Sequence, residues 1–265
     1  MILPSASLPG WLLALAAAAA YALGATLSRH VRARHGLLAL IPAWLLHGAT
    51  LAWGLLAGAP HFGFAPALSM TAWLVLTAYA IEHQLFPQMR VRWTLCALGG
   101  ASALLGALFP GRPLHDTASP WLAPHLTLGI ACYGLFAAAV VHAWLMSRAE
   151  RQIRLAADPH SGMPLLTLER LTFRFVTAGF VLLTATLLAG WVFSERLYGR
   201  VWIWDHKAVF SVLSWATFAV LLFGRARLGW RGRRAVRVLY VGAALLLLSY
   251  AGSRFVMEVV LRRGA

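Results

Sequence analysis

The chain has 265 residues, of which 60% are hydrophobic and 12% are charged, and its mean hydropathy is +0.72. This composition is typical of integral membrane proteins and excludes an ordinary soluble domain. The formal net charge of +15 would indicate nucleic-acid binding in a soluble chain. Here the basic residues lie between apolar runs, where they set membrane topology and attract anionic lipid. We therefore expect the lipid bilayer as a partner, and no nucleic acid.

A membrane-spanning helix needs about 20 mostly apolar residues, and the sequence has about eight such runs. The runs cover approximately residues 9–27, 37–58, 68–86, 93–109, 122–146, 174–194, 208–224 and 236–260. No Lys or Arg precedes the first run, which is longer than a signal-peptide core of roughly 7–15 residues, so we expect it to stay as a helix. We predict an all-α integral membrane protein that forms one polytopic domain over residues 1–265.

The distribution of basic residues between alternate loops predicts the orientation. One set of loops holds 16 of the 23 Lys and Arg residues and the other set holds 7. The richer set should be cytoplasmic. We expect a multi-pass protein of the bacterial inner membrane. Both termini are then expected on the outer, periplasmic side, although Arg262 and Arg263 near the C-terminus run against the rule.

Two polar segments belong to the cytoplasmic set. In PLLTLERLTFRF, Leu165, Leu168 and Leu171 recur at three-residue steps, which predicts an amphipathic helix at the cytoplasmic surface. The RARLGWRGRRAVR segment has six arginines. It is typical of a cytoplasmic anchor that contacts lipid phosphates.

No motif for catalysis occurs in the sequence. A Ser-His-Asp order, HExxH, a P-loop and a Gly-rich phosphate loop are all absent. Cys96 and Cys132 lie inside apolar runs without Cys-x-x-Cys spacing, which indicates packing residues and no thiolate metal site. We therefore do not expect an enzyme.

Ten histidines are many for a chain with so little polar surface. Five of them lie in or beside loops, where solvation by water explains them; these are His30, His35, His61, His83 and His160. We expect His142 at the membrane interface. Four candidates for a functional site are left, namely His47, His125, His206 and His115.

His47 lies in the middle of a run, where an ionisable residue suggests function but a neutral imidazole bonded to a neighbouring helix is equally acceptable. His125 lies at the outer end of the fifth run and could ligate an iron held against indole rings. His206 could ligate a metal or be solvated. His115 is the weakest candidate.

The stretch YGRVWIWDHKAVFSVLSW, residues 198–215, fills a short polar gap between the sixth and seventh runs. Three tryptophans surround Asp205, His206 and Lys207. Tryptophan rings often anchor helix ends at the headgroup level. An aromatic platform with a carboxylate and a cation beside it can also hold a flat, partly anionic ligand. Both interpretations stay open on the residues alone.

This stretch resembles the signature of the CcsA/CcmC-type cytochrome c assembly family, a tryptophan-rich outer loop of the form W-G-x-x-W-x-W-D-P-K-E. The matching residues are Gly199, Trp202, Trp204, Asp205 and Lys207, followed by Trp215 and by residues 229–234. Residues 168–171 and 119–125 also resemble family segments, so the resemblance is strongest over residues 119–265. The short chain with about eight runs is most similar to the YpjD/HemX-like branch.

The resemblance implies that heme is handled at the outer membrane face, between the tryptophan-rich loop and histidine ligands from flanking segments. It implies cofactor-binding roles for Trp202, Trp204, Asp205, Lys207, Arg200, Arg196 and Trp121. His125 matches the upstream ligand of the family, and His206 and His47 are further candidate iron ligands. The basic side chains could pair with propionates, and Asp205 could orient Lys207 or His206.

We therefore expect an inner-membrane protein of the CcsA-like superfamily that binds or handles heme in cytochrome c biogenesis or its regulation. Other cytochrome-assembly membrane proteins are the expected partners. The alternative is an accessory or permease-like subunit that has kept the fold and lost heme binding. The departures from the family pattern bear on this choice: the motif's Pro is His206 here, its Glu is Ala208, and Gly224 stands where family members carry a histidine.

Overall fold

The computed structural model describes residues 7–30, 38, 40–57, 61–85, 93–113, 121–155, 164–195 and 203–261. The chain divides into two compact units, which are described separately. The first comprises Met1–Asp116 with Ser161–Met163, and the second comprises Thr117–His160 and Pro164–Ala265. The sequence-based expectation of a single domain stays a prediction.

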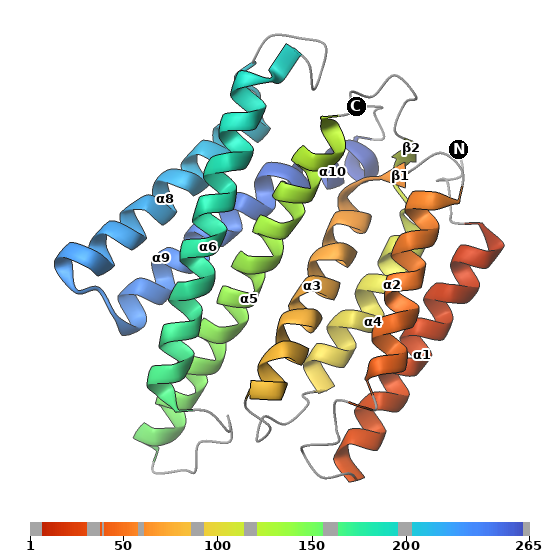
Figure 1. Cartoon of the computed structure of the whole chain (residues 1–265), viewed down its shortest axis with the longest axis horizontal. Coiled ribbons are helices and arrows are strands. Elements are labelled where there is room, and N and C mark those ends of the chain that lie inside the picture. Colours follow the sequence, from red (N-terminus) through yellow and green to blue (C-terminus); the bar gives the residue numbers. More distant parts are fainter. Residues whose placement is uncertain are drawn as a thin grey trace. The chain divides into compact units, whose positions relative to one another are not determined.

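The first unit is a bundle of helices with one small strand pair (Figure 1). Its elements are α1 (Leu8–His30), α2 (Ile41–Leu56), β1 (His61–Phe62), α3 (Phe64–Leu85), α4 (Trp93–Leu108) and β2 (Arg112–Pro113). Helix α1 packs against α2 and α4, and α3 packs against α4. The antiparallel strands pair His61 with Pro113 and Phe62 with Arg112, which joins the start of α3 to the end of α4.

The strand pair depends on a glycine that no other residue could replace without strain. Gly111 has a φ of +82°, in the left-handed region that side chains disfavour. A Cβ at this position would also lie 2.5 Å from the backbone carbonyl carbon of Phe62. The close approach therefore fixes how the chain leaves α4.

The second unit contains the longer helices (Figure 1). Its elements are α5 (Leu122–Arg154), α6 (Leu165–Val192), α8 (His206–Leu228) and α9 (Gly232–Leu247), which continues through the π-helical segments Leu248–Gly252 and Val256–Val260 on either side of α10 (Ser253–Phe255). Helix α5 packs along α6, and α8 packs along α9. The consecutive helices run in opposite directions, so alternate helix ends meet at the same end of the unit.

Two phenylalanines link the four helices of the second unit. The rings of Phe136 on α5 and Phe218 on α8 stack with centroids 3.8 Å apart. Each ring lies against a glycine of the neighbouring helix, Gly179 on α6 and Gly242 on α9. Small residues at such contacts let helix backbones approach closely in membranes. The core of this unit is therefore aromatic in the middle and glycine-lined at its edges.

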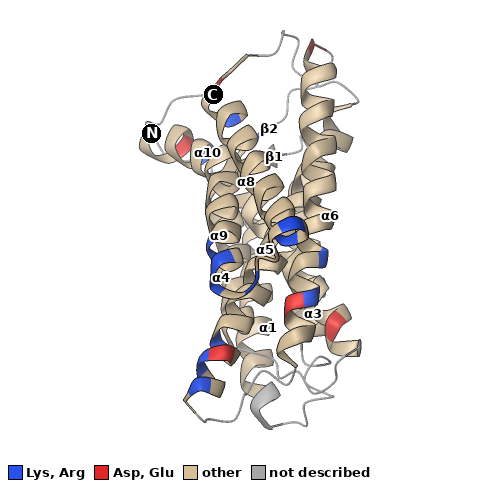
Figure 2. Ribbon diagram, turned by 90° about the vertical axis from the view of Figure 1, so that its left-hand side faces the viewer, with Lys and Arg blue, Asp and Glu red and all other residues tan. Residues whose placement is uncertain are grey.

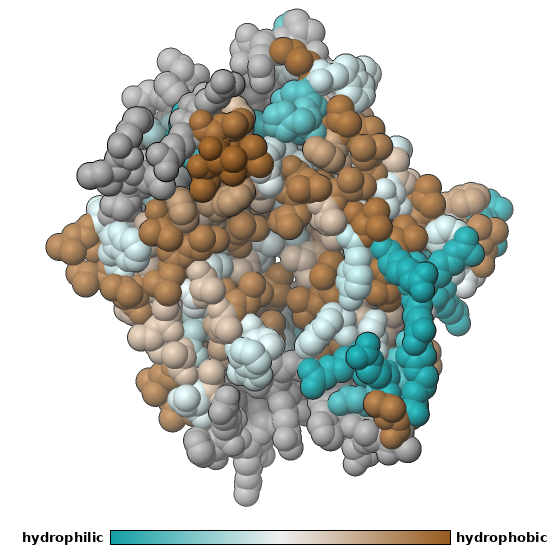
Figure 3. Space-filling model, turned by 180° about the vertical axis from the view of Figure 1, so that it is seen from behind, coloured by the Kyte–Doolittle hydropathy of each residue, from teal (hydrophilic) through white to brown (hydrophobic). Residues whose placement is uncertain are grey.

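The helices agree with the predicted all-α membrane architecture. Within the described residues, six helices are long and apolar enough to cross a membrane, and two shorter apolar helices are Ile41–Leu56 and Trp93–Leu108. Apolar side chains cover much of the surface seen in Figure 3, as expected where lipid replaces water. Each helix overlaps one of the predicted runs, and the largest differences are the start of α6 and the end of α5.

One sequence-based expectation was wrong in its boundaries. The amphipathic segment that begins at Leu165 is not a separate surface helix, because it forms the first three turns of the continuous helix α6. Its apolar positions Leu168 and Thr172 are fully buried. Burial against a helical neighbour, and not against the membrane surface, thus explains the periodicity of this segment.

Figure 2 marks the positions of the basic residues along the ribbon, and in the second unit they gather mainly at one end. This is the end where α5 and α8 finish and α6 and α9 begin, and it carries Arg148, Arg151, Arg154, Arg170, Arg174, Arg225, Arg227, Arg231, Arg233, Arg234 and Arg237. Among the residues that the structure describes, the opposite end carries Lys207 and Arg254. The unit has the charge asymmetry on which the orientation was predicted, and the side occupied by the termini stays a prediction.

The Gly242 contact can be tested by adding one methyl group. A Cβ at this position would lie 2.8 Å from the Phe218 ring, so Gly242→Ala should lower the free energy of unfolding by about 1–2 kcal/mol, because overpacking outweighs the better helix propensity of alanine. Gly129→Ala on α5 is the matched control, since its Cβ would make only an ordinary contact of 3.9 Å with Thr186. Thermal unfolding in detergent should show a lower midpoint for Gly242→Ala alone.

Candidate functional site

The carboxylate of Asp205 begins helix α8. Its extended backbone places Asp205 at the N-cap, where the side chain accepts a hydrogen bond from the backbone N–H of Ala208 at 2.9 Å. An aspartate at this position pairs one of the otherwise unbonded N–H groups of the first turn and complements the helix dipole. The WDHK sequence is therefore a helix start, and Asp205 has a structural task besides any role toward a ligand.

The rings next to this cap are open to their surroundings. Trp204 is 67% exposed, His206 is exposed at the first position of α8, and Lys207 is half-buried. Trp202, Arg196, Arg200 and His115 lie outside the described residues. Of the predicted loop site, the structure thus describes the part from Trp204 onward.

Trp121 and His125 lie at the start of α5. The Trp121 ring, 55% exposed, stacks on Phe193 at the end of α6 with centroids 6.1 Å apart and an angle of 6° between the planes. His125 is half-buried one turn further along, and its backbone N–H donates to the carbonyl of Trp121. The predicted upstream ligand is therefore positioned next to an aromatic pair.

A hydrogen bond between α6 and α8 fixes the position of the WDHK segment along the helix axes, which we call its level. The indole N–H of Trp215 donates to the Thr184 hydroxyl at 2.9 Å. Phe193 lies about 14 Å after Thr184 on α6, and His206 lies about 14 Å before Trp215 on α8. Because these helices are antiparallel, His206 is level with Phe193, on which Trp121 stacks.

A second pair of contacts sets the level of His125 against α9. The Tyr133 hydroxyl donates to the Leu246 carbonyl and lies 3.0 Å from the Ser249 hydroxyl. His125 lies about 12 Å before Tyr133, and Arg254 lies about 12 Å beyond Leu246, on helices that run in opposite directions. His125 and Arg254 are therefore at similar levels. The aromatic end, as we call it, consists of Trp121, His125, Phe193, Arg254 and residues 204–207.

Arg254 is a member of the aromatic end that the sequence reading did not single out. Its guanidinium lies 4.0 Å from the Glu258 carboxylate, and the two side chains are only 24% and 12% exposed. It also lies over the Tyr250 ring at 5.9 Å. An arginine and a glutamate within an apolar run are the signal that could have identified it, since charges at such positions usually serve a function.

His47 lies in the first unit and is fully buried. Its Nδ1 is 3.2 Å from the Tyr21 hydroxyl and its Nε2 is 2.9 Å from the Ser69 hydroxyl. Both ring nitrogens are therefore bonded to neighbouring helices, which is the second of the two interpretations that the sequence allowed. Iron ligation by His47 would require one of these hydrogen bonds to break.

Two other histidines differ from their predicted surroundings. His83 was expected beside a loop in water, yet it is 3% exposed on α3 and stacks on Tyr79. His142 was expected at the membrane interface, yet it is 4% exposed, contacts the Phe175 ring of α6 and bonds through Nδ1 to the Ala138 carbonyl at 2.7 Å. Both rings lie within helices, His83 on α3 and His142 on α5, where packing buries them.

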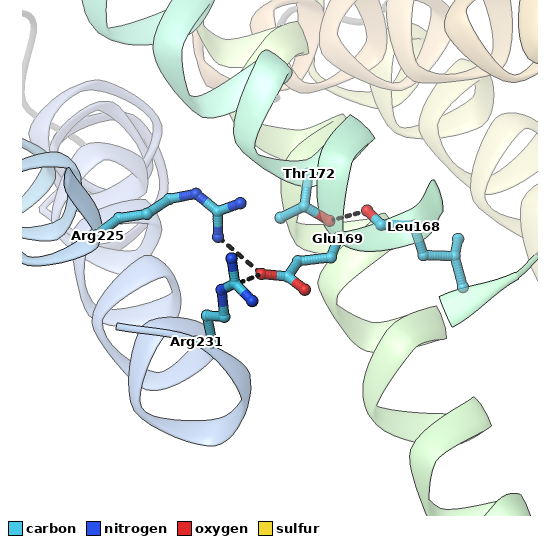
Figure 4. Close-up of polar contacts among 5 residues, drawn as sticks. All are labelled: Leu168, Glu169, Thr172, Arg225 and Arg231. Atoms are coloured by element: carbon cyan, nitrogen blue, oxygen red, sulfur yellow. Dashed lines mark hydrogen bonds and ion pairs between the residues drawn. The ribbon is translucent and has the colours of Figure 1, made fainter. Parts of the chain in front are cut away.

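Glu169 organises the opposite, arginine-rich end of the second unit (Figure 4). Its carboxylate oxygen lies 2.8 Å from Arg225 at the end of α8 and 3.8 Å from Arg231 in the following turn. Arg225 also covers the Phe173 ring at 3.6 Å, and Arg234 covers Trp230 at 4.1 Å. The six-arginine segment is thus fixed to α6 through one carboxylate.

The donor set of the aromatic end fits a flat, anionic macrocycle. Wide indole surfaces are exposed, imidazoles stand at the start of two helices, and Lys207 and Arg254 supply positive charge for carboxylates. The described residues contain no group of three or more His, Cys, Asp or Glu side chains that could hold a bare metal ion. A macrocycle that brings its own four nitrogen ligands needs only one or two from the protein.

The fold and the aromatic end define a multi-pass helical membrane protein with an aromatic, histidine-bearing surface at one end of its second unit. The chain belongs to the family described as cytochrome C assembly protein, whose sequence profile matches residues 34–261. The family resemblance expected from the tryptophan-rich stretch is confirmed.

Named relatives refine this assignment. The inner membrane protein YpjD of Escherichia coli K12 is 33% identical over 175 residues, which cover 63% of this chain and 66% of that protein. The cytochrome c biogenesis protein CcsA of Gloeobacter violaceus is 35% identical over 92 residues, which cover 35% of this chain and 27% of that protein. CcsA of Nostoc punctiforme is 32% identical over 111 residues, or 41% and 31% of the two chains.

The chain thus matches just under two thirds of the YpjD relative and about a third of the CcsA relatives. Its similarity to a named inner membrane protein and its six candidate spans confirm the predicted location in the bacterial inner membrane.

The capping role of Asp205 predicts a stability effect that is separate from ligand binding. Asp205→Ala should destabilise α8 by about 1 kcal/mol, because the Ala208 N–H loses its acceptor. Asp205→Ser should restore most of this loss, since a serine hydroxyl can cap in the same way. Hydrogen exchange of the first turn of α8 would measure both; equal protection in wild type and Asp205→Ala would contradict the cap.

Glu169 should matter more to stability than an exposed glutamate. Glu169→Gln should lower the free energy of unfolding by about 1–3 kcal/mol, because a half-buried arginine loses its charged acceptor. The matched control is Glu150→Gln, whose partner Arg154 lies 3.6 Å away on an exposed surface and contributes about 0.3–0.5 kcal/mol. Equal thermal midpoints of the two variants would show that the Glu169 cluster is not a structural contact.

Proposed function

We propose that this protein binds heme at the aromatic end of its second unit and handles it in cytochrome c biogenesis or its regulation. The observation that carries the proposal is the convergence of helix starts at this end. The Trp215–Thr184 hydrogen bond and the Tyr133–Leu246 hydrogen bond bring the WDHK segment and His125 to one end of the same unit. Membership of the cytochrome c assembly family supports the choice of heme over other flat ligands.

Each described residue of the aromatic end has a distinct task in this proposal. The exposed indole of Trp204 supplies stacking surface for the porphyrin, and the Trp121–Phe193 pair holds the start of α5 in place. His125 would bind the iron, and His206, exposed at the start of α8, is a second candidate ligand. Lys207 and Arg254 are placed to pair with propionates, while Asp205 holds the turn in which Trp204 and His206 stand.

Heme bound here would supply an iron that accepts axial nitrogen ligands and carries one electron. The protein's own residues bind and orient it, and no described constellation calls for a covalent step. We propose that the aromatic end faces the periplasm and the arginine-rich end faces the cytoplasm, as the asymmetry of basic residues favours. His47 is not part of the proposed site, because its nitrogens are already bonded within the first unit.

The first test is the absorbance of the protein purified in detergent from cells with ample heme, and after addition of hemin. The wild type should show a Soret band, and His125→Ala should lose most of it or shift its position, because an axial ligand is removed. His160→Ala, which removes a histidine of the long polar segment between the fifth and sixth predicted runs, should leave the spectrum unchanged.

The same measurement distinguishes the proposed function from the alternative, an accessory or permease-like subunit without heme. If the purified wild type has no Soret band and gains none with hemin, the proposed function fails. A band that is identical in wild type and His125→Ala would keep heme binding but remove His125 from the site.

A further inference from the structure

A chain of three buried polar groups crosses the first unit. The Tyr21 hydroxyl on α1 lies 3.2 Å from His47 Nδ1 on α2, and His47 Nε2 lies 2.9 Å from the Ser69 hydroxyl on α3. Tyr21 is 2% exposed, His47 is 0% exposed and Ser69 is 1% exposed. Polar groups in such surroundings are retained only when their hydrogen bonds are made.

The surroundings of Tyr21 decide the direction of these hydrogen bonds. The Gly99 backbone lies against its ring, since a Cβ there would come within 2.6 Å of the ring. His47 is its hydrogen-bond partner among the described residues. If His47 Nδ1 donated, the phenol proton would be left without an acceptor, at a cost of about 1–3 kcal/mol. Tyr21 therefore donates to Nδ1, the proton of the neutral ring lies on Nε2, and Nε2–H donates to the Ser69 oxygen.

Because the Ser69 oxygen accepts from His47, the Ser69 hydroxyl proton can be donated to another group. Thr71 and Thr77, on the same helix, donate to the carbonyls four residues earlier. Ser69 makes no such bond within the described part of the chain. The hydrogen-bonded chain thus ends in a donor.

That donor lies in the wall of a cavity of about 180 Å³. Apolar and aromatic groups form much of the wall, which includes Leu51, Trp53, Leu55, Pro66, Met70 and Ala103. Gly106 of α4 also lines it, and a Cβ there would lie 3.5 Å from the Ser69 oxygen. The missing side chain leaves room directly beside the hydroxyl.

Two other polar groups of the wall already have acceptors. The Thr50 hydroxyl donates to the Leu46 carbonyl at 2.9 Å, and the Trp53 indole N–H donates to the Ser7 hydroxyl at 3.1 Å. The wall also includes Ser7 and His61. Ser69 is the donor that the buried hydrogen-bonded chain orients, in a largely apolar cavity. Empty apolar cavities of about 150 Å³ in protein interiors accept a benzene ring, so this one has the size for a substituted ring.

We propose that the cavity of the first unit is a binding site for a lipid-soluble ring that carries a carbonyl group, the chemistry of a quinone head group. The Ser69 hydroxyl donates to the carbonyl, and Tyr21 and His47 are positioning residues that hold Ser69 in the donating orientation. The site lies wholly within the first unit and does not depend on heme at the aromatic end.

Two probes of nearly the same shape test this proposal on the full chain in detergent. Duroquinone has two ring carbonyls, and hexamethylbenzene has methyl groups in their place. Saturation-transfer NMR of the probe methyl signals gives the ratio of the two dissociation constants in each variant, which removes the part due to partition into detergent. One hydrogen bond of about 0.5–1.5 kcal/mol predicts a ratio about twofold to tenfold more favourable to duroquinone in wild type than in Ser69→Ala.

The controls separate loss of the donor from loss of the fold. Ser102→Ala removes another buried serine, whose hydroxyl donates to the Gly99 carbonyl at 3.0 Å, and should keep the wild-type ratio. Gly106→Ala adds a methyl group at an ordinary contact distance of 3.5 Å from Ser69, so the protein should fold while binding of duroquinone weakens.

Two results would overturn the proposal. One is the absence of saturable binding of duroquinone to the wild type, which would leave the cavity to water or lipid. The other is the same ratio of dissociation constants in wild type and Ser69→Ala. Neither result bears on the Soret band, so failure of this site and failure of the heme site are distinguishable.

Discussion

Hydrocarbon offers no hydrogen-bond partner to a peptide group, so each backbone group of this chain within the bilayer must be paired inside its own helix. This constraint explains why apolar runs of about the right length become helices throughout. Consecutive helices that each cross the membrane must run in opposite directions. In the second unit, alternation brings the starts of α5 and α8 and the end of α6 to one end, and all the described arginines except Arg254 to the other. The lipid bilayer, by requiring helices that alternate in direction, thus separates an aromatic end from a basic end.

Side chains that cannot leave the apolar interior obey the same rule and set the register between helices. Trp215 reaches Thr184, and Tyr133 reaches Leu246, because an unpaired indole or phenol would be costly there. These bonds fix the levels of His206 and His125. In the first unit, Tyr21, His47 and Ser69 satisfy one another. The polar contacts that position both candidate sites are thus required first of all by burial.

The number and position of the helices could be predicted from the sequence, since hydropathy reports the bilayer constraint directly. The ends of the helices could not. Helix α6 begins at Leu165 and α5 continues to Arg154, because packing against one another stabilises turns that hydropathy alone assigns to loops. His142 on α5 packs against Phe175 of α6, and His83 on α3 is buried as well. Their burial depends on contacts between helices, which a single run of residues does not contain.

The tryptophan-rich stretch was identifiable from its residues, but the task of Asp205 was not. A carboxylate before a helix can cap it, pair with Lys207 or orient His206, and the choice depends on the backbone angles of the turn. The structure assigns the oxygen to the Ala208 N–H. For His47 the sequence left two interpretations equally open, and the two hydrogen bonds to its ring favour the structural one. Arg254 was overlooked because its run read as an ordinary apolar span.

The central claim, that the aromatic end of the second unit holds heme through His125, is tested most directly by locating the iron in an experimental structure of the hemin-loaded protein. We predict an iron-to-Nε2 distance of about 2 Å at His125, with the porphyrin against Trp204. An iron bound elsewhere in the chain, or at the aromatic end without contact to His125, would contradict the claim.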